Sequence, residues 1–238
     1  MQKVLILALV ISFCVGWEFH RTQMFPNEDT YTLQQSQYEF DQIIDHYNYQ
    51  TSGTWKQRYF VHSDYYNPAK GPIFLYICGE AECRGISDLS ILVKMAEQNE
   101  GMVLSLEHRF YGKSMPFGVN SLNTDKLKYL SSEQALRDLG YFLTSMKNSG
   151  LHRITPNNPW VVVGGSYAGA MSAWFRNKYP HLTIGAISSS GVVTAVEDFR
   201  MFDEQMYISS HKSGDFCNQA IVNTTNYVEG QVTGENKD

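Results

Sequence analysis

The chain has 238 residues, which is long enough for one full domain with a hydrophobic core, and its apolar fraction of 43% is ordinary for a folded protein. Its formal net charge is −5 at pH 7, and its lysines and arginines form no basic stripe. Binding to nucleic acid is therefore not expected, because nothing would neutralise the phosphates.

Residues 1–16 have the pattern of a secretory signal peptide. Lys3 provides the positive charge, the apolar run Val4–Val15 is too short to span a bilayer, and a small-residue cleavage site follows. The alternative is a retained anchor or a buried strand, but charged and aromatic residues begin abruptly at Trp17, which favours cleavage. We expect residues 17–37 to form a flexible leader. The protein would then lie in the secretory pathway, outside the cell or in a lysosome or vacuole, with no membrane span once the signal is removed.

Apolar patterns predict the first three strands. In 40–47 and 55–61 aromatic and polar residues alternate, which suits antiparallel strands with one solvated face, joined by a turn over 48–54. Segment 72–78 is almost continuously apolar. It is therefore predicted to lie inside the sheet.

Capping residues mark the helices that follow. Asp88 has the N-cap position of a helix over 89–99, which Gly101 ends, and segment 102–106 is a further buried strand. Ser131 caps the next helix, with Gln134 in the capping-box position. An apolar stripe marks the buried face of that helix: Ala135, Leu136, Leu139, Phe142, Leu143 and Met146, with Gly150 as the stop.

Segment 160–180 organises the rest of the chain. Residues 160–163 form a β-branched run typical of a buried strand, and residues 168–179 have helix-forming composition until Pro180. Ser166 therefore lies at a sharp strand-to-helix turn, which only small neighbours permit. These neighbours are Gly164, Gly165, Ala168 and Gly169. The pattern is that of the nucleophile elbow of an α/β-hydrolase, with alanine at position 168 where the motif has glycine.

The elbow assigns chemistry to two residues. Ser166 is the predicted nucleophile, and the N–H group of Tyr167 is a donor to the oxyanion at the start of the helix. The alternative is a glycine-rich turn in a phosphate-binding α/β fold. We favour the elbow because no Walker lysine follows the glycines and no Gly-x-Gly-x-x-Gly motif is present.

Strand and helix alternate from Pro72 to a last strand over 183–189, which predicts a mostly parallel sheet with helices on both faces, an α/β fold. In such sheets the active site lies at the carboxyl ends of the strands. Here they carry Gly79, Glu80, segment 107–109 and Ser166. The chain after residue 192 is polar and helix-prone. We therefore expect the N-terminal part of a hydrolase domain over 38–192 and the start of a helical cap, cut short, over 193–238.

Cysteine usage and one sequon fit an oxidising compartment. Cys78 and Cys83 are close enough in sequence to close a small loop, which leaves Cys217 without a partner once Cys14 is removed with the signal peptide. A glycosylation sequon begins at Asn223, although such triplets are common by chance.

Four motifs stand in order along the chain. They are Pro-Ile-Phe-Leu-Tyr-Ile-Cys-Gly-Glu (72–80), Glu-His-Arg-Phe-Tyr-Gly-Lys-Ser-Met-Pro-Phe-Gly (107–118), Lys-Tyr-Leu-Ser-Ser-Glu-Gln-Ala-Leu-Arg-Asp-Leu (128–139), and the elbow with its helix, Gly-Gly-Ser-Tyr-Ala-Gly-Ala-Met-Ser-Ala-Trp-Phe-Arg-Asn-Lys-Tyr-Pro-His-Leu (164–182). Together they resemble the serine peptidase family S28, the group of lysosomal Pro-X carboxypeptidase, dipeptidyl-peptidase II and thymus-specific serine protease. The resemblance covers about Phe40 to Cys217.

The resemblance implies an α/β-hydrolase core with a helical cap inserted near residue 190. It implies an exopeptidase that cleaves short peptides at bonds next to proline or alanine, without metal or cofactor. Ser166 would be the nucleophile and the Tyr167 N–H one oxyanion donor, and the loop at Gly79 and Glu80 would supply the second. In the family the acid and the histidine of the triad follow the cap, and this chain ends before either. We therefore expect a fragment that is nearly inactive by itself.

Neither histidine after the elbow suits the role of general base. His181 lies a full helix length from Ser166, and His211 lies in the expected cap with Asp203 upstream. His108 precedes the serine in the chain, and we interpret it as structural or substrate-lining.

Some interpretations stay open. Glu107 and Arg109 are expected to form a buried ion pair rather than an acid/base couple, because charges in such places need partners. Glu80 either holds the free amino terminus of a substrate or braces the oxyanion loop. The alternative functions are an inactive remnant that acts as a binding protein, and an esterase or lipase, which the absence of a His-Gly-Gly-Gly segment disfavours.

Overall fold

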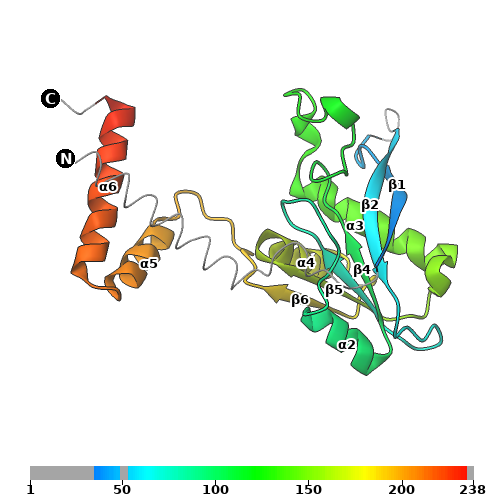
Figure 1. Ribbon diagram of the computed structural model, residues 1–238. Coiled ribbons are helices and arrows are strands. Elements are labelled where there is room, and N and C mark those ends of the chain that lie inside the picture. The colour runs from blue at the N-terminus through cyan, green and yellow to red at the C-terminus, as the bar shows by residue number, and fades with distance from the viewer. Residues whose placement is uncertain (1–34, 49–52, 235–238) are drawn as a thin grey trace. The chain divides into compact units, whose positions relative to one another are not determined.

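The computed structural model describes residues 35–48 and 53–234, which form two compact units that divide between Val193 and Thr194 (Figure 1). The expected signal peptide and most of the expected leader lie outside these residues. Of the helices in the described ranges, none combines the length and the apolar character needed to cross a membrane.

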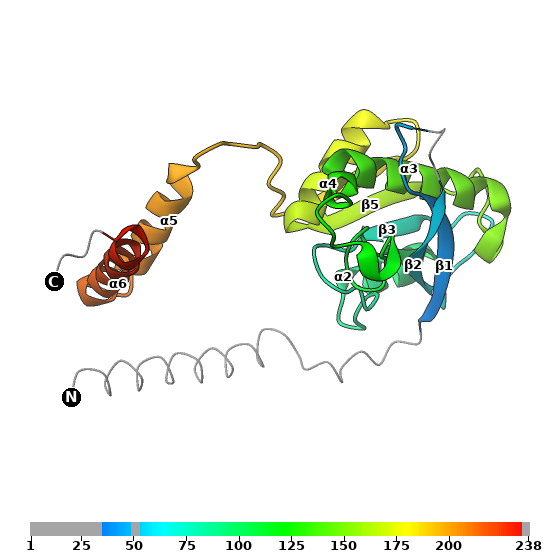
Figure 2. The ribbon, with the colours of Figure 1, turned by 90° about the horizontal axis from the view of Figure 1, so that it is seen from above.

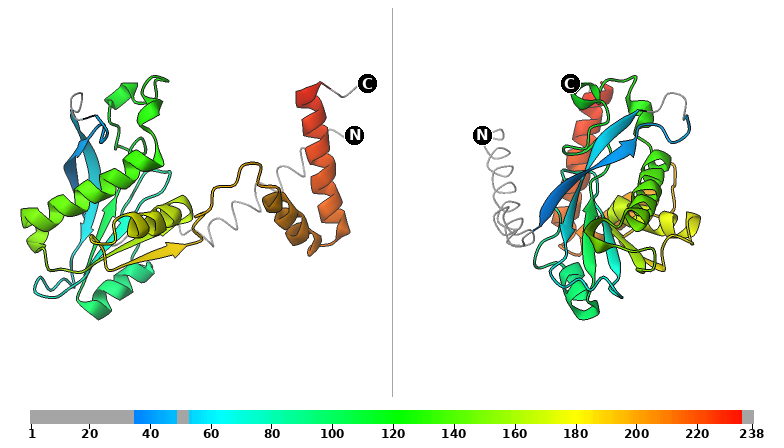
Figure 3. Two further views of the ribbon diagram at one scale, coloured as in Figure 1. Left: turned by 180° about the vertical axis from the view of Figure 1, so that it is seen from behind. Right: turned by 90° about the vertical axis from the view of Figure 1, so that its right-hand side faces the viewer.

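A six-stranded sheet with the order β1-β2-β4-β3-β5-β6 forms the centre of the first unit. The strands are β1 (Ser36–Ile43), β2 (Thr54–His62), β3 (Ile73–Ile77), β4 (Met102–Leu106), β5 (Trp160–Gly165) and β6 (Gly185–Ser189). Strands β4, β3, β5 and β6 are parallel, and β1 and β2 join them as an antiparallel pair. The predicted mostly parallel α/β sheet is confirmed. Figure 3 shows the hairpin at one edge of the sheet and β6 at the other.

The hairpin begins earlier than the sequence pattern predicts. β1 starts at Ser36, inside the expected leader, because contacts on both sides order this segment. The amide of Gln35 exchanges two hydrogen bonds with the backbone of Ile86, and the ring of Tyr38 stacks on Tyr59 with centroids 5.4 Å apart. These partners lie far along the chain, so the local composition of the leader could not show them.

Each face of the sheet has its own helices. Ile73, Leu75 and Ile77 of β3 point to the side of α3 (Ser132–Ser149) and α4 (Ser166–Lys178), whereas Phe74 points to the side of α2 (Ile91–Asn99). Figure 2 shows α3 and α4 together on one face and α2 on the other. All six residues of the predicted stripe on α3 are buried.

The ends of α2 differ from the prediction. Its N-cap is Ser90, whose hydroxyl accepts from the Leu92 N–H at 3.2 Å, and not Asp88. At the other end the residue that caps the helix is Glu100, in the left-handed conformation with φ 53°, and not the predicted stop Gly101. Gly101 is needed instead for close packing, since a Cβ there would lie 2.8 Å from the carbonyl oxygen of Pro72.

The ends of α3 are as predicted with one change. The Ser131 hydroxyl accepts from the Gln134 N–H at 3.2 Å, and Gly150 ends the helix with φ 70°. The Gln134 side chain does not return to its own helix end. It accepts from the His46 N–H at 3.0 Å and donates to Asp45 at 2.7 Å, so it fastens the end of the β1 segment to α3.

The second unit consists of α5 (Arg200–His211) and α6 (Asp215–Thr233), and no strand occurs in its described part. Asn218 is the single buried residue of that part, and its amide donates to the Tyr207 carbonyl at 3.1 Å and to Ser210 at 2.8 Å. Apolar side chains such as Phe216, 89% exposed, lie open on the helices. The interpretation of this unit as the start of a cap stays a prediction.

Candidate active site

Ser166 lies at the turn between β5 and α4, with its side chain exposed. Its φ angle is +55°, in the left-handed region that non-glycine residues rarely adopt. Such backbone strain persists only where the surrounding structure imposes it, and it clusters at functional sites. The strand, the strain and the exposure are those of a nucleophile elbow.

Close backbone contacts explain the small residues of this turn. A Cβ at Gly164 would lie 2.1 Å from the carbonyl oxygen of Ala168, and one at Gly169 would lie 2.6 Å from that of Ser189. Ala168 itself is only 2% exposed, and its methyl group belongs to the main core. Alanine in place of the second glycine of the motif is thus accommodated by packing.

The start of α4 can receive an anion. The N-cap residue Gly165 has no side chain to accept from the first N–H groups of the helix. These groups, including that of Tyr167, are therefore not occupied by a side-chain cap, and the helix dipole favours negative charge there.

The loop after β3 reaches the elbow. In the parallel pairing of β3 and β5, Tyr76 is opposite Val163. Both strands end at the same edge of the sheet, so Gly79 and Glu80 follow β3 at the edge where Ser166 follows β5. A disulfide between Cys78 and Cys83 closes this loop, whereas Cys217 is a free thiol in the second unit.

An open pocket of about 290 Å³ lies between this loop and the elbow. Its lining contains the residues predicted there, Glu80, His108 and Tyr167, and others that the sequence did not reveal: Tyr111, Leu130, Ser131 and Ser132. The last four lie within the motifs 107–118 and 128–139, but the sequence could not show that the fold brings these two segments to the same pocket. Glu80 is exposed and shows no hydrogen bond within the described residues, so its carboxylate is open to a ligand.

A chain of polar contacts runs along the pocket wall. The Oη atom of Tyr167 lies 3.3 Å from Nε2 of His108 and 3.2 Å from the hydroxyl of Ser132. Nδ1 of His108 donates to the carbonyl of Arg109 at 2.7 Å, so Nε2 is the acceptor of the neutral ring. Burial lowers the pKa of His108 below 6.5 and raises the pKa of Tyr167 above 10.0. Both side chains are therefore uncharged at neutral pH.

Glu107 and Arg109 are buried and paired, but not with each other, so the predicted pair is wrong. Glu107 binds Arg58 of β2, with Nε 3.1 Å from Oε2 and Nη2 2.5 Å from Oε1. Arg109 binds Asp138 of α3 through two contacts of 2.6 Å. The two side chains, two residues apart beyond β4, reach partners on different elements.

No histidine in the described part of the chain is hydrogen-bonded to Ser166. His181 is exposed beyond the end of α4, whose 13 residues span about 20 Å. His211 lies in the second unit, 3.3 Å from Asp215. In the same described ranges, no three His, Cys, Asp or Glu side chains cluster as metal ligands would. Asn223 is exposed on α6.

Comparison with known proteins identifies the family. A model described as serine carboxypeptidase S28 matches residues 42–236. The chain is 42% identical to "Probable serine protease EDA2" of Arabidopsis thaliana, over 83% of this chain and 40% of that protein. It is 35% identical to "Lysosomal Pro-X carboxypeptidase" of Homo sapiens (76% and 37% covered) and 37% identical to "Thymus-specific serine protease" of Mus musculus (69% and 32% covered).

The chain thus spans about two fifths, or less, of the length of these relatives. The family match, by contrast, extends over most of the described residues and includes the β3 loop, the pocket and the elbow. The fold is that of an α/β-hydrolase, and the chain belongs to the serine carboxypeptidase S28 family of serine peptidases.

Proposed function

We propose that Ser166 is the nucleophile of a serine exopeptidase that cleaves short peptides at bonds next to proline or alanine. The observation that carries the proposal is the exposed, strained serine at the strand-to-helix turn, with the helix N-terminus behind it. In the reaction the hydroxyl would attack the acyl carbon, and the Tyr167 N–H with a donor from the Gly79–Glu80 loop would stabilise the oxyanion. Neither metal nor cofactor is needed.

The substrate class rests on the relatives. The name of the human relative states Pro-X carboxypeptidase activity and a lysosomal place. A disulfide fits an oxidising compartment, and Asn223 is accessible for glycosylation. These observations support a site of action in the secretory pathway, outside the cell or in the lysosome.

The general base is a separate part of the proposal. Since no described histidine is placed to accept the Ser166 proton, we propose that residues 1–238 alone are acylated far more slowly than a protein that carries the whole triad. Binding and oxyanion stabilisation by themselves would leave a residual acceleration of roughly 10³–10⁴ over water.

A fluorophosphonate probe tests both statements. On a protein that carries this chain together with the whole triad it should label Ser166, fail on Ser166→Ala, and succeed on Ser189→Ala, which removes another exposed serine at the same sheet edge. Labelling of Ser166→Ala at the wild-type rate would refute the nucleophile. Rapid labelling of the 238-residue chain would refute the slow acylation.

Substrate panels separate the remaining alternatives. Proline-containing dipeptide amides should be cleaved in preference to short acyl esters. The reverse preference would favour an esterase, and no turnover of either class, even with the whole triad present, would favour a non-catalytic binding protein.

A further inference from the structure

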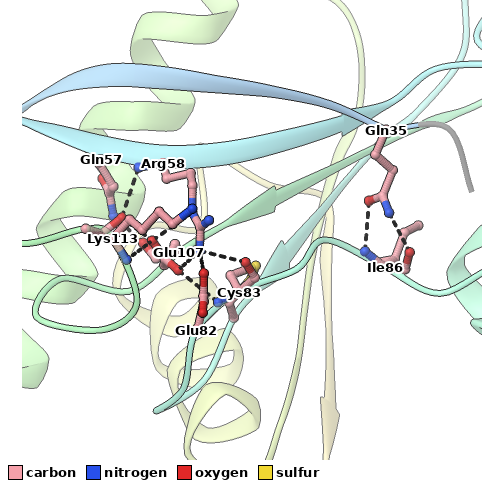
Figure 4. Close-up of a disulfide and its surroundings, with 10 residues drawn as sticks. Gln35, Gln57, Arg58, Glu82, Cys83, Ile86, Glu107 and Lys113 are labelled. Atoms are coloured by element: carbon pink, nitrogen blue, oxygen red, sulfur yellow. Dashed lines mark hydrogen bonds and ion pairs between the residues drawn. A yellow bond between two sulfur atoms is a disulfide. The ribbon is translucent and has the colours of Figure 1, made fainter. Parts of the chain in front are cut away.

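The buried carboxylate of Glu107 connects three segments. It binds Arg58 of β2, accepts from the Cys83 N–H at 2.8 Å, and accepts from the Lys113 N–H at 3.1 Å and the Ser114 hydroxyl at 2.7 Å. Glu107 is fully buried. Figure 4 shows these partners converging on one side chain from both sides.

The two loops that Glu107 joins form walls of the pocket that Tyr167, the neighbour of Ser166 in the chain, also lines. The loop closed by the disulfide contributes Glu80, and the turn after β4 contributes His108 and Tyr111. None of the five atoms that touch the Glu107 carboxylate lines the pocket itself. The carboxylate therefore acts on the pocket only through the backbone that it holds.

The backbone of the turn is shaped to admit this carboxylate. Gly112 has φ +56°, and a Cβ there would lie 2.0 Å from Oε1 of Glu107 and 3.0 Å from the Cα of Glu82. Glycine at this position thus lets the carboxylate and the disulfide loop approach the turn together.

The disulfide is a second fastening of the same loop. Cys78 and Cys83 are 4% exposed and pack against Phe60, and Arg58 lies over the Phe60 ring at 5.2 Å. Arg58 also donates to the Cys83 carbonyl at 2.8 Å. Both the N–H and the carbonyl of Cys83 are therefore fixed, in addition to its sulfur.

We propose that Glu107 is a positioning residue, which together with the Cys78–Cys83 disulfide sets the loop that presents Gly79 and Glu80 to Ser166. This inference rests on the proposed function, and it adds a buried brace to it. A donor loop that is fixed before the substrate arrives stabilises the transition state without reorganisation, whereas a displacement of about 1 Å can cost roughly 100-fold in rate.

The test is kcat per active site in a protein that carries this chain with the whole triad, with active sites counted by exhaustive fluorophosphonate labelling. Glu107→Gln removes the charge that Arg58 and the loop N–H groups share, and kcat per labelled site should fall about 10- to 100-fold with a smaller change in KM. A merely structural role would lower the number of active sites and leave kcat per site unchanged. That unchanged value would overturn the inference.

Gln35→Ala is the matched control. It breaks the two bonds to Ile86, which belong to the same β3-to-α2 connection but lie outside the disulfide ring (Figure 4). Its kcat per site should stay within about twofold of wild type. A fall as large as that of Glu107→Gln would overturn the inference, because any loosening of the connection would then suffice.

A second variant covers the case in which Glu107→Gln does not fold. Cys78→Ala with Cys83→Ala leaves the charges in place and cuts only the covalent link, and the same fall in kcat per site is expected. Hydrogen exchange adds a readout free of catalysis: the N–H of residue 83, which donates to Glu107, should lose protection in both variants and keep it in Gln35→Ala.

The outcomes separate the two proposals. If the wild-type protein is not acylated at Ser166, the proposed function and the inference fall together. If it is acylated and both variants keep the wild-type kcat per site, only the inference falls.

Discussion

Two buried ion pairs involve the segment that follows β4: Arg58 with Glu107, and Arg109 with Asp138. They connect this segment to different parts of the molecule. Arg58 and Glu107 are fastened to the backbone of loops that line the pocket. Arg109 and Asp138 are fastened mainly to regular elements: Arg109 donates to the carbonyls of Ile43 in β1, of Ile44 just after it and of Tyr129, and Asp138 belongs to α3.

The comparison shows how one short segment can serve both the site and the core. Their side chains are equally inaccessible, with 6% and 0% exposure in the first pair and 0% and 2% in the second. What differs is the kind of backbone to which they are attached: loops for the first pair, and mainly β1 and α3 for the second. We therefore expect the first pair to affect the rate and the second to affect mainly the stability.

The largest effect is expected from Asp138→Ala. It leaves the Arg109 guanidinium buried without an anion and removes the partner of His46, whose Nε2 lies 2.8 Å from Oδ1. Breaking a buried pair on one side typically costs about 3–5 kcal/mol. Urea unfolding followed by tryptophan fluorescence should show a loss of this size.

The double variant Arg109→Met with Asp138→Leu is the control for that prediction. It removes both charges and fills the space with apolar groups, so it should recover much of the loss. A loss below about 1 kcal/mol for Asp138→Ala would show that this pair does not stabilise the core and would end the contrast.

An intermediate effect on stability is expected when the pH is lowered, because of His108, which lies between Glu107 and Arg109 in the sequence. Burial lowers its pKa below 6.5, against the attraction of Asp138 and Glu80 and with the repulsion of Arg109. The unfolded chain therefore takes up a proton near pH 6.5 that the folded ring does not. The resulting stability is present above this pH and is lost as the pH falls, by up to about 1.4 kcal/mol per unit for one group.

The measurement is the free energy of unfolding between pH 7.5 and 5 for wild type and His108→Gln. The variant should show a shallower decline. His152 has a pKa lowered by burial as well and contributes to both curves alike, so the difference between them isolates His108. Parallel curves would show that His108 is not held neutral by the fold.

The elements and the elbow could be predicted because their signals are local. The stripe on α3, the strand–turn–helix pattern around Ser166 and the stop at Gly150 each depend on residues of one continuous short segment. Tertiary packing is consistent with these local signals and does not override them.

The partners of charged and polar side chains could not be predicted, because they are distant in sequence. The expectation that Glu107 and Arg109 need charged partners was right, but the partners are distant: Arg58 is 49 residues from Glu107, and Asp138 is 29 residues from Arg109. Gln134 lies at the start of α3 as predicted, yet its side-chain amide binds the His46 N–H and Asp45, just after β1. The N-cap of α2 could not be predicted for a similar reason. Asp88 and Ser90 are both good N-cap residues, and only the structure, in which Leu89 is 73% exposed, shows that the helix begins after Ser90.

The smallest effect is expected from Glu82→Gln. This variant tests whether Glu107 affects the rate because it is buried. Glu82 lies in the disulfide loop and binds the same guanidinium at 3.2 Å, but its side chain is 45% exposed. Solvent screens such a contact, and Arg58 keeps both Glu107 and the Cys83 carbonyl. The variant should therefore lose no more than about 0.5–1 kcal/mol of stability and keep the wild-type kcat per site.

Urea unfolding and the active-site-normalised assay used for Glu107→Gln would check this prediction. A tenfold fall in kcat per site would mean that the exposed arm, and not the buried carboxylate, sets the loop. If Glu82→Gln has only this small effect, loss of a negative charge near Arg58 is not by itself enough to lower kcat per site. The rate change in Glu107→Gln would then belong to the one carboxylate that also holds the backbone of both pocket loops.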